Sequence, residues 1–146
     1  MSDTNVVNVI TTTESPNRII ITSARAPGVQ QFLYQMYVFT VPGNLSAGTG
    51  RARLYMPSAV TFSNVRISAG TTPLGSEIIV DVNKNGSTVF TTQANRPKIF
   101  AGQTTDAVSV PDISEIVAGD YITVDIDAVG SIFAGSDLTV QIELTP

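Results

Sequence analysis

The feature that most constrains this fold is the dipeptide Asn85-Gly86, which lies between two runs of β-branched residues. A two-residue type I′ turn needs positive φ at both central positions, and Asn and Gly adopt it at the least cost, so the dipeptide predicts a tight β-hairpin. Placing it at the tip fixes which residues of the two strands face each other: Lys84 and Ser87, Asn83 and Thr88, and Val82 and Val89. In that register four apolar side chains share one buried face: Ile78, Val80, Val82 and Val89.

The low charge of the chain suits strands and turns better than exposed helices. Charged residues make up 14% of the 146, whereas about 25% is usual for a soluble domain. A chain of this length forms one domain around one core by default. The formal net charge of −4 gives no positive field that would attract phosphate backbones, so no nucleic-acid binding is expected. The most apolar stretch, residues 32–41, is about half as long as a membrane-spanning helix, and no membrane role is expected.

Cysteine and histidine are both absent from the sequence. Their absence removes disulfides, thiol nucleophiles, zinc sites of the Cys/His kind and imidazole bases. No active site is visible, so we expect no enzymatic activity, no cofactor, no metal and no small-molecule substrate. The first residues, Met1 to Asn5, contain neither the basic region nor the apolar run of a secretory signal, which favours synthesis in a reducing cytoplasm.

The chain divides into two regions of different pattern. Residues 1–28 are mostly polar and rich in Thr and Asn, with β-prone patches at 6–10 and 19–22. This region suits either a frayed terminus with one edge strand or an extended N-terminal arm that orders against a neighbouring subunit by strand addition. Residues 29–146 are predicted to form the β-sandwich domain. Its first strand, residues 32–41, is nearly apolar on both faces and needs cover within the fold or from another subunit.

From Phe32 onward the sequence predicts about eight strands separated by Gly, Pro and Asn turns, which is typical of an all-β antiparallel sandwich or jelly roll. Outside the hairpin these strands are expected at 32–41, 51–56, 60–67, 107–110, 121–127 and 137–144, and residues 96–100 are expected to be a short extended piece. Asn64 interrupts the alternation of its strand and predicts either a β-bulge or a slip of face nearby. Asp112 is able to cap one helical turn at 111–116. The last two strands alternate most regularly, and the loop 129–136 between them predicts a long-looped hairpin.

Three patterns are candidate sites, and each has a simpler structural explanation. Residues 81–86 match the first half of a calcium loop, but Thr92 stands where such a loop requires a bidentate Glu, so a strand entering a turn accounts for them. The stripe Arg51, Arg53 and Tyr55 is either a solvated strand face or a contact for an acidic neighbour.

The third pattern is a set of carboxylates that crowd the C-terminal third: Asp112, Glu115, Asp120, Asp125, Asp127 and Asp137. A pair of carboxylates can catalyse glycoside hydrolysis. No spacing here selects a pair, and Asp125 with Asp127 is the outward register of one strand. A solvated face is therefore the preferred interpretation, and an acid/base glycosidase is retained only as a remote alternative.

An ordered series of motifs runs from Pro73 to Leu144. The series reads P-L-G-S-E-I-I-V-D-V-N-K-N-G-S-T-V-F-T-T, then R-P-K-I-F-A-G, then A-G-D-Y-I-T-V-D-I-D-A-V-G, and finally A-G-S-D-L-T-V-Q-I-E-L. It covers about half of the chain and resembles a β-sandwich module of tailed-bacteriophage virion proteins, especially those of cyanophages. In such proteins the module occurs in capsid decoration, or cement, proteins and in tail or fibre components.

The resemblance implies a structural virion protein without catalytic residues. A single sandwich with a β-prone arm is most similar to a capsid cement protein, which would be a homotrimer that binds and stabilises the shell of the major capsid protein. The resemblance places such a protein on the capsid surface of the virion after synthesis in the host cytoplasm. The alternative is a tail, baseplate or fibre module that binds host-surface glycans through a jelly-roll face or through the loops 68–76 and 129–136.

Overall fold

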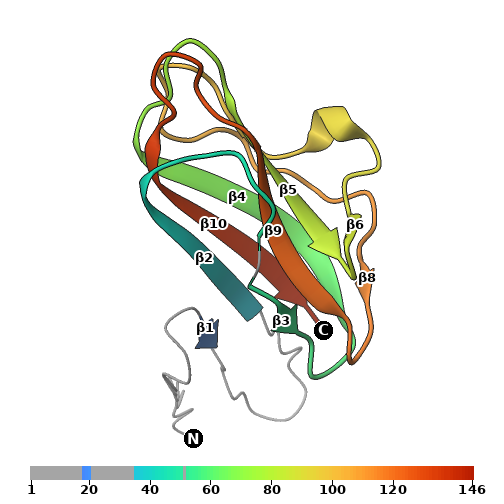
Figure 1. The fold of residues 1–146 in the computed structure, drawn as a ribbon. Coiled ribbons are helices and arrows are strands. Elements are labelled where there is room, and N and C mark those ends of the chain that lie inside the picture. Colours follow the sequence, from blue (N-terminus) through green and yellow to red (C-terminus); the bar gives the residue numbers. More distant parts are fainter. Residues whose placement is uncertain (1–17, 21–34, 51) are drawn as a thin grey trace, which may run out of the picture.

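The computed structural model describes residues 18–20, 35–50 and 52–146, and it arranges them as two antiparallel β-sheets packed face to face (Figure 1). Sheet A has the order β1-β2-β10-β4-β8, with bounds Arg18–Ile20, Gln35–Asn44, Ser136–Thr145, Val60–Thr71 and Glu115–Ile116. Sheet B has the order β3-β9-β5-β6, with bounds Leu54–Tyr55, Tyr121–Ala128, Ile78–Lys84 and Ser87–Thr88, and β7 (Lys98–Ile99) also pairs with β5. A 3-10 turn, η1, spans Gln93–Asn95. The predicted all-β sandwich is confirmed.

The predicted domain boundary between residues 28 and 29 lies outside the described residues. Of the predicted arm, only β1 is described, and it pairs with the start of β2. The strand expected at 32–41 is described from Gln35 and continues past Pro42 to Asn44, where its pairing with β10 has a register shift between Ser136 and Leu138. Three residues of the expected strand, 32–34, also lie outside the described part.

The core lies between the two sheets and follows the alternation of the strands. In β10 every second residue is buried, and the buried apolar side chains are Leu138, Val140, Ile142 and Leu144. The opposing face of β5 is equally buried and consists of Ile78, Val80 and Val82. Full burial of one such side chain stabilises a fold by ~1.5–3 kcal/mol, so these two faces dominate the stability of the sandwich.

The Asn-Gly hairpin forms as predicted between β5 and β6. Asn83 pairs with Thr88 and Lys84 pairs with Ser87. The φ angles of the two turn residues are 53° and 84°, which is the left-handed region that a type I′ turn requires. The backbone N–H of Val89 donates to the carbonyl of Val82 at 2.9 Å. The four apolar residues expected on one buried face are all fully buried: Ile78, Val80, Val82 and Val89.

The bulge expected near Asn64 is present in β4. Glu143 pairs with Asn64, whereas the next residue of β10, Leu144, pairs with Phe62, so Ser63 is the extra residue. The strand also continues past the predicted end at residue 67, to Thr71. The beginning of the loop expected at 68–76 is therefore strand.

The hairpin predicted between 121–127 and 137–144 is wrong. β9 lies in sheet B between β3 and β5, and β10 lies in sheet A between β2 and β4. Both strands have one apolar face, and the loop 129–136 carries the chain across the sandwich so that these faces oppose each other in the core. Alternation shows that a strand has one buried face but not which strand lies beside it.

The helical turn predicted at 111–116 is also wrong. Glu115 and Ile116 form β8 and pair with Thr61 and Val60 at the start of β4. Two predicted strands are shorter than expected. Residues 51–56 contribute only β3, and 107–110 contributes an isolated bridge between Ser109 and Val65.

Candidate interaction surfaces

Asp125 is engaged in the fold rather than left to solvent as the sequence suggested. Its carboxylate accepts a hydrogen bond from the backbone N–H of Gly50 at 2.7 Å and another from the Asn83 amide at 2.9 Å. The loop approaches β9 so closely here that a Cβ on Gly50 would lie 1.8 Å from the carbonyl oxygen of Val124. Asp125 therefore holds both the neighbouring strand and the loop that precedes β3.

Asp81 lies directly opposite Asp125 in the β5–β9 ladder and is only 8% exposed. Burial raises the pKa of Asp81, while the hydrogen bond that it accepts from the Thr88 hydroxyl at 2.7 Å acts in the opposite direction. On the same outer face of sheet B, Asp127 forms an ion pair with Arg96. Asp125 and Asp127 point outward from β9 as predicted. The outer face of sheet B is, however, a network of hydrogen bonds and an ion pair rather than a set of solvated carboxylates.

Three other carboxylates hold loops by accepting backbone N–H groups. Asp112 accepts from Thr92 at 2.6 Å, Asp120 from Val117 at 2.9 Å, and Asp137 from Gly43 at 2.8 Å. Each of these bonds lowers the pKa of the carboxyl that accepts it, because a hydrogen bond to the ionised form favours that form. Asp112 thus fixes the loop at η1 instead of capping a helical turn of its own.

The side chains of the partial calcium pattern at 81–86 do not converge on one point but form hydrogen bonds with different partners. Asp81 bonds Thr88, and Asn83 bonds Asp125. The side chain of Asn85 donates to Asp120 at 2.7 Å and accepts from the backbone N–H of Tyr121. Over residues 35–50 and 52–146, no group of three or more acidic side chains is placed to hold a metal ion. The same part of the chain has no helix long and apolar enough to cross a membrane.

The predicted basic stripe is only partly described, since Arg51 lies outside the described residues. The guanidinium of Arg53 stands 4.7 Å from the ring centroid of Tyr121, and the Tyr121 ring lies 5.6 Å from that of Tyr55. Arg53 is exposed and makes a cation–π contact on the surface of its own subunit.

One end of the sandwich carries an uncharged apolar tip, which we define as the loops 71–76 and 129–136. Figure 1 shows these loops together at the top of the sandwich. Leu74 bridges to Phe133, and the N–H of Ile132 donates to the carbonyl of Leu74 at 2.9 Å. Ile132 is 81% exposed and Leu74 is 45% exposed. The structure thus joins the two loops that the glycan-binding alternative named, and gives them a protruding aliphatic side chain.

The tip is rigid because its glycines permit close backbone approach. A Cβ on Gly130 would lie 1.9 Å from the carbonyl oxygen of Phe133, and Gly135 has a φ of 90°. Neither position accommodates another residue without moving its neighbours. The two loops together contain no Asp, Glu, Lys or Arg, and depletion of charge is typical of the centre of protein interfaces.

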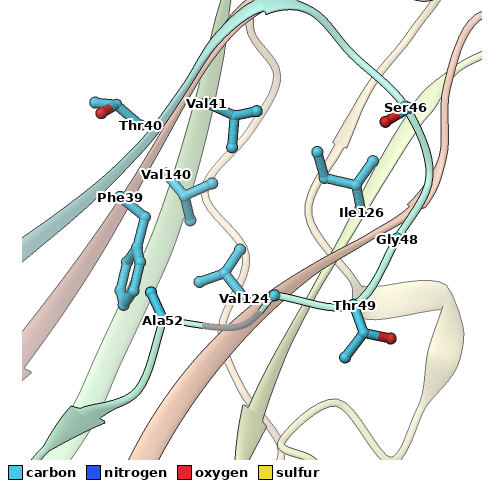
Figure 2. Close-up of a pocket in the computed structure, with 11 residues that line it drawn as sticks. Phe39, Thr40, Val41, Ser46, Gly48, Thr49, Ala52, Val124, Ile126 and Val140 are labelled. Carbon is cyan, nitrogen blue, oxygen red and sulfur yellow. The ribbon is translucent and has the colours of Figure 1, made fainter.

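An apolar cleft opens between the sheets beside β2 (Figure 2). Phe39, Val41 and Val140 of sheet A point toward Val124 and Ile126 of β9 across a space of about 320 Å³. The loop from Ser46 to Ala52 borders the opening, and its Gly48 pairs with Ile126. Phe39 is the single aromatic residue among the side chains that line the cleft in the described part of the chain.

A second, more open groove of about 460 Å³ is lined by residues between Ala94 and Val110. Three partly exposed apolar side chains line it, Phe100, Val108 and Val110, together with the charged groups Lys98 and Asp106. Polar and apolar side chains are mixed along this groove, and its polar groups do not converge on one point where a ligand could bind.

The fold and these surfaces define a small all-β sandwich protein. No protein-family model matches the sequence, and no curated protein matches it. Among solved structures, a chain of the cyanophage Pam1 capsid asymmetric unit is similar with a TM-score of 0.50 and 14% sequence identity, over 84% of this chain and 91% of that chain. At this identity the likeness shows a shared fold.

The sequence did not reveal the tip, the cleft or the Asn83–Asp125 bond. The absence of charge in 71–76 and 129–136 was a usable signal for the tip. The other two depend on which strands are neighbours, which the sequence left open.

Proposed function

We propose that this chain is a structural virion protein that decorates and stabilises the shell formed by the major capsid protein of a tailed phage. In this proposal it is a homotrimeric cement protein without catalytic function, located on the capsid surface. Residues 1–28 serve as an arm between neighbouring subunits. The observation that carries the proposal is the fold shared with a chain of a cyanophage capsid asymmetric unit over most of both chains.

The way the chain uses its polar groups supports a binding role without chemistry. Asp125, Asp112, Asp120 and Asp137 are occupied by hydrogen bonds that hold strands and loops. A catalytic pair of carboxylates needs groups that can exchange protons with a substrate. These four carboxylates instead support the fold from within.

The uncharged apolar tip supports contact with another protein. Its most exposed side chain, Ile132, stands on a rigid loop, so its burial would cost little conformational entropy. An apolar anchor of this kind commonly dominates the binding energy of an interface. The tip is accordingly the part of the subunit that we assign to the shell.

The test measures binding to empty shells assembled from the major capsid protein of the same genome. Wild-type protein should co-sediment with shells in hundreds of copies per particle and raise their melting temperature. Ile132→Lys should reduce binding at least tenfold. The matched control is Val117→Lys, since Val117 is 58% exposed in the loop after β8, away from the tip (Figure 1).

Two outcomes would contradict the proposal. Labelling that finds a handful of copies on tails, combined with binding to host-surface glycans on an array, would establish the tail-module alternative. Equal binding of the Ile132→Lys and Val117→Lys variants would remove the tip from the contact while leaving shell binding itself in place.

A further inference from the structure

One edge of β2 is only partly paired in the described structure. β2 pairs with β10 along its length, but on the other edge β1 pairs with only three residues, Gln35 to Tyr37. No described strand pairs with this edge from Val38 to Asn44. A strand edge with free N–H and C=O groups accepts another strand through backbone hydrogen bonds.

The same edge borders the apolar cleft of Figure 2. Phe39 and Val41 point from β2 into the cleft and are only partly buried. Alternate side chains of a strand point to the same side. A strand added beside β2 would therefore pair with its backbone and direct every second side chain into the cleft, between the two sheets.

The chain contains a segment with the matching pattern. Ahead of β1, the apolar residues apart from Met1 gather in the run V-V-N-V-I, residues 6–10. In an extended conformation Val7 and Val9 point to one side, while Val6, Asn8 and Ile10 point to the other. The side of Val7 and Val9 is therefore the one without a polar side chain. No charged residue lies between Asp3 and Glu14, so this run can enter an apolar site without burying a charge.

The register of β1 argues against insertion of the run into its own subunit. Arg18 pairs with Tyr37, so the chain before Arg18 is directed along β2 toward Val41. In that register Pro16, which has no N–H, would stand beside Phe39 and the carboxylate of Glu14 beside Val41. Both residues are unsuited to those positions.

The length of the chain ahead of β1 also argues against insertion of the run into its own subunit. Val41 is four residues from Tyr37 along β2, which is about 13 Å at ~3.3 Å per residue. Ile10 is eight residues ahead of Arg18, which corresponds to about 26 Å of extended chain. If the chain continued extended in the register of β1, the apolar run would therefore lie past the cleft of its own subunit.

We infer that residues 6–10 of one copy add as an edge strand to β2 of a second copy and insert Val7 and Val9 into its cleft. Repeated around a ring, this head-to-tail exchange closes a cyclic oligomer. It supplies a subunit contact for the homotrimer of the proposed function, on which it rests. It is tested on the protein in solution without capsids, so it can fail while capsid binding stands.

The absence of natural cysteine makes disulfide trapping a direct test. Val7→Cys and Val9→Cys are each combined with Val41→Cys in the full chain and oxidised. We expect at least one pair to give covalent oligomers on a non-reducing denaturing gel. The control, Asn8→Cys with Val41→Cys, should give several times less because Asn8 points away. Intramolecular cross-links alone, no cross-link from either pair, or equal yield from the control would overturn the inference.

A second experiment measures oligomer mass by light scattering. The double variant Val7→Asp/Val9→Asp places two carboxylates on the inserted side and should fall to monomer mass. Val6→Asp/Asn8→Asp carries the same two charges on the opposite side and should keep the wild-type mass. Circular dichroism confirms that the sandwich is folded in both. Retention of the oligomer by the first variant, or its loss from both, would overturn the inference.

Discussion

The strands within sheet A and the strands within sheet B are held in place in different ways. Sheet A is built on three long strands, β2 and β10 of ten residues each and β4 of twelve. Sheet B has two longer strands, β5 with seven residues and β9 with eight, and its other described strands, β3, β6 and β7, have two residues each. Sheet A therefore has a longer backbone ladder than sheet B.

Side-chain hydrogen bonds make up for the short ladder of sheet B. Asp125 ties β9 to β5 and to the loop at Gly50, while Asp81 ties β5 to Thr88 of β6. The outer face of sheet A has fewer such bonds among the described residues, of which the Asn64–Glu143 pair at the bulge is one. The comparison indicates that short edge strands persist where polar side chains fix them in place.

The largest expected effect is in the core of sheet A. Ile142→Ala empties a fully buried position of β10 and should lower the free energy of unfolding by ~2–5 kcal/mol. The neighbouring Gln141→Ala changes the outer face and should stay within about 0.5 kcal/mol. Urea denaturation measures both. Similar losses from the two variants would mean that the outer face of sheet A contributes as much stability as its core, contrary to this comparison.

The next effect tests the side-chain bonds of sheet B. Asp125→Ala leaves the N–H of Gly50 and the amide of Asn83 without their acceptor and should cost about 1–3 kcal/mol.

Its counterpart in sheet A is Glu143→Ala, which removes the partner of Asn64 and should cost no more than about 1.5 kcal/mol. Denaturation of the two variants side by side compares the sheets directly. If Glu143→Ala lowered the stability more than Asp125→Ala, the idea that sheet B depends more on side-chain hydrogen bonds than sheet A would be wrong.

A smaller effect is expected at the hairpin of sheet B. Gly86 has a φ of 84°, and an L-residue in the left-handed region costs about 1–2 kcal/mol. Gly86→Val should therefore lower stability by at least this amount and impair oligomer assembly. Gly48→Val is the control for stability alone, because a Cβ at Gly48 would meet no atom within 4 Å and the φ of this residue is not positive, whereas its place at the border of the cleft excludes it as a control for assembly. A fully stable Gly86→Val protein would refute the turn-based register.

The smallest effects concern pH. The pKa values of Asp112, Asp120 and Asp137 are lowered by the backbone N–H groups that they accept. A group whose pKa is lower in the folded state contributes stability above its unfolded pKa of about 3.9. That contribution disappears as the pH falls through the folded pKa. Melting temperatures should therefore fall on acidification from about pH 5 to about pH 2, less steeply in Asp137→Asn than in wild type.

The pKa of Asp81 is shifted in the opposite direction, so its effect on the pH dependence of stability is also opposite. Burial raises its pKa, so its ionisation costs stability at neutral pH, and the cost disappears below its unfolded pKa. Asp81→Asn keeps an oxygen that can accept from Thr88 and should raise the melting temperature slightly at about pH 7 but not at about pH 3. A decrease at neutral pH would show that the charge on Asp81 is needed by the outer face of sheet B.

Local features were predictable from the sequence because they depend on neighbouring residues. Asn85-Gly86 determined its own turn and register, and the break in alternation at Asn64 located the bulge. The sheet to which β9 and β10 belong was not predictable, since alternation says nothing about neighbours. The bond between Asn83 and Asp125 depends on the pairing of strands that are distant in sequence.

The length of β10 has a mechanical consequence. Its ten residues span about 34 Å at ~3.4 Å per residue, and they connect the end of the sandwich that carries the tip to the end where the chain terminates (Figure 1). Because β10 is hydrogen-bonded on both edges, the two ends stay a fixed distance apart. Tension applied at the tip would pass along the strand to the far end without stretching the subunit itself.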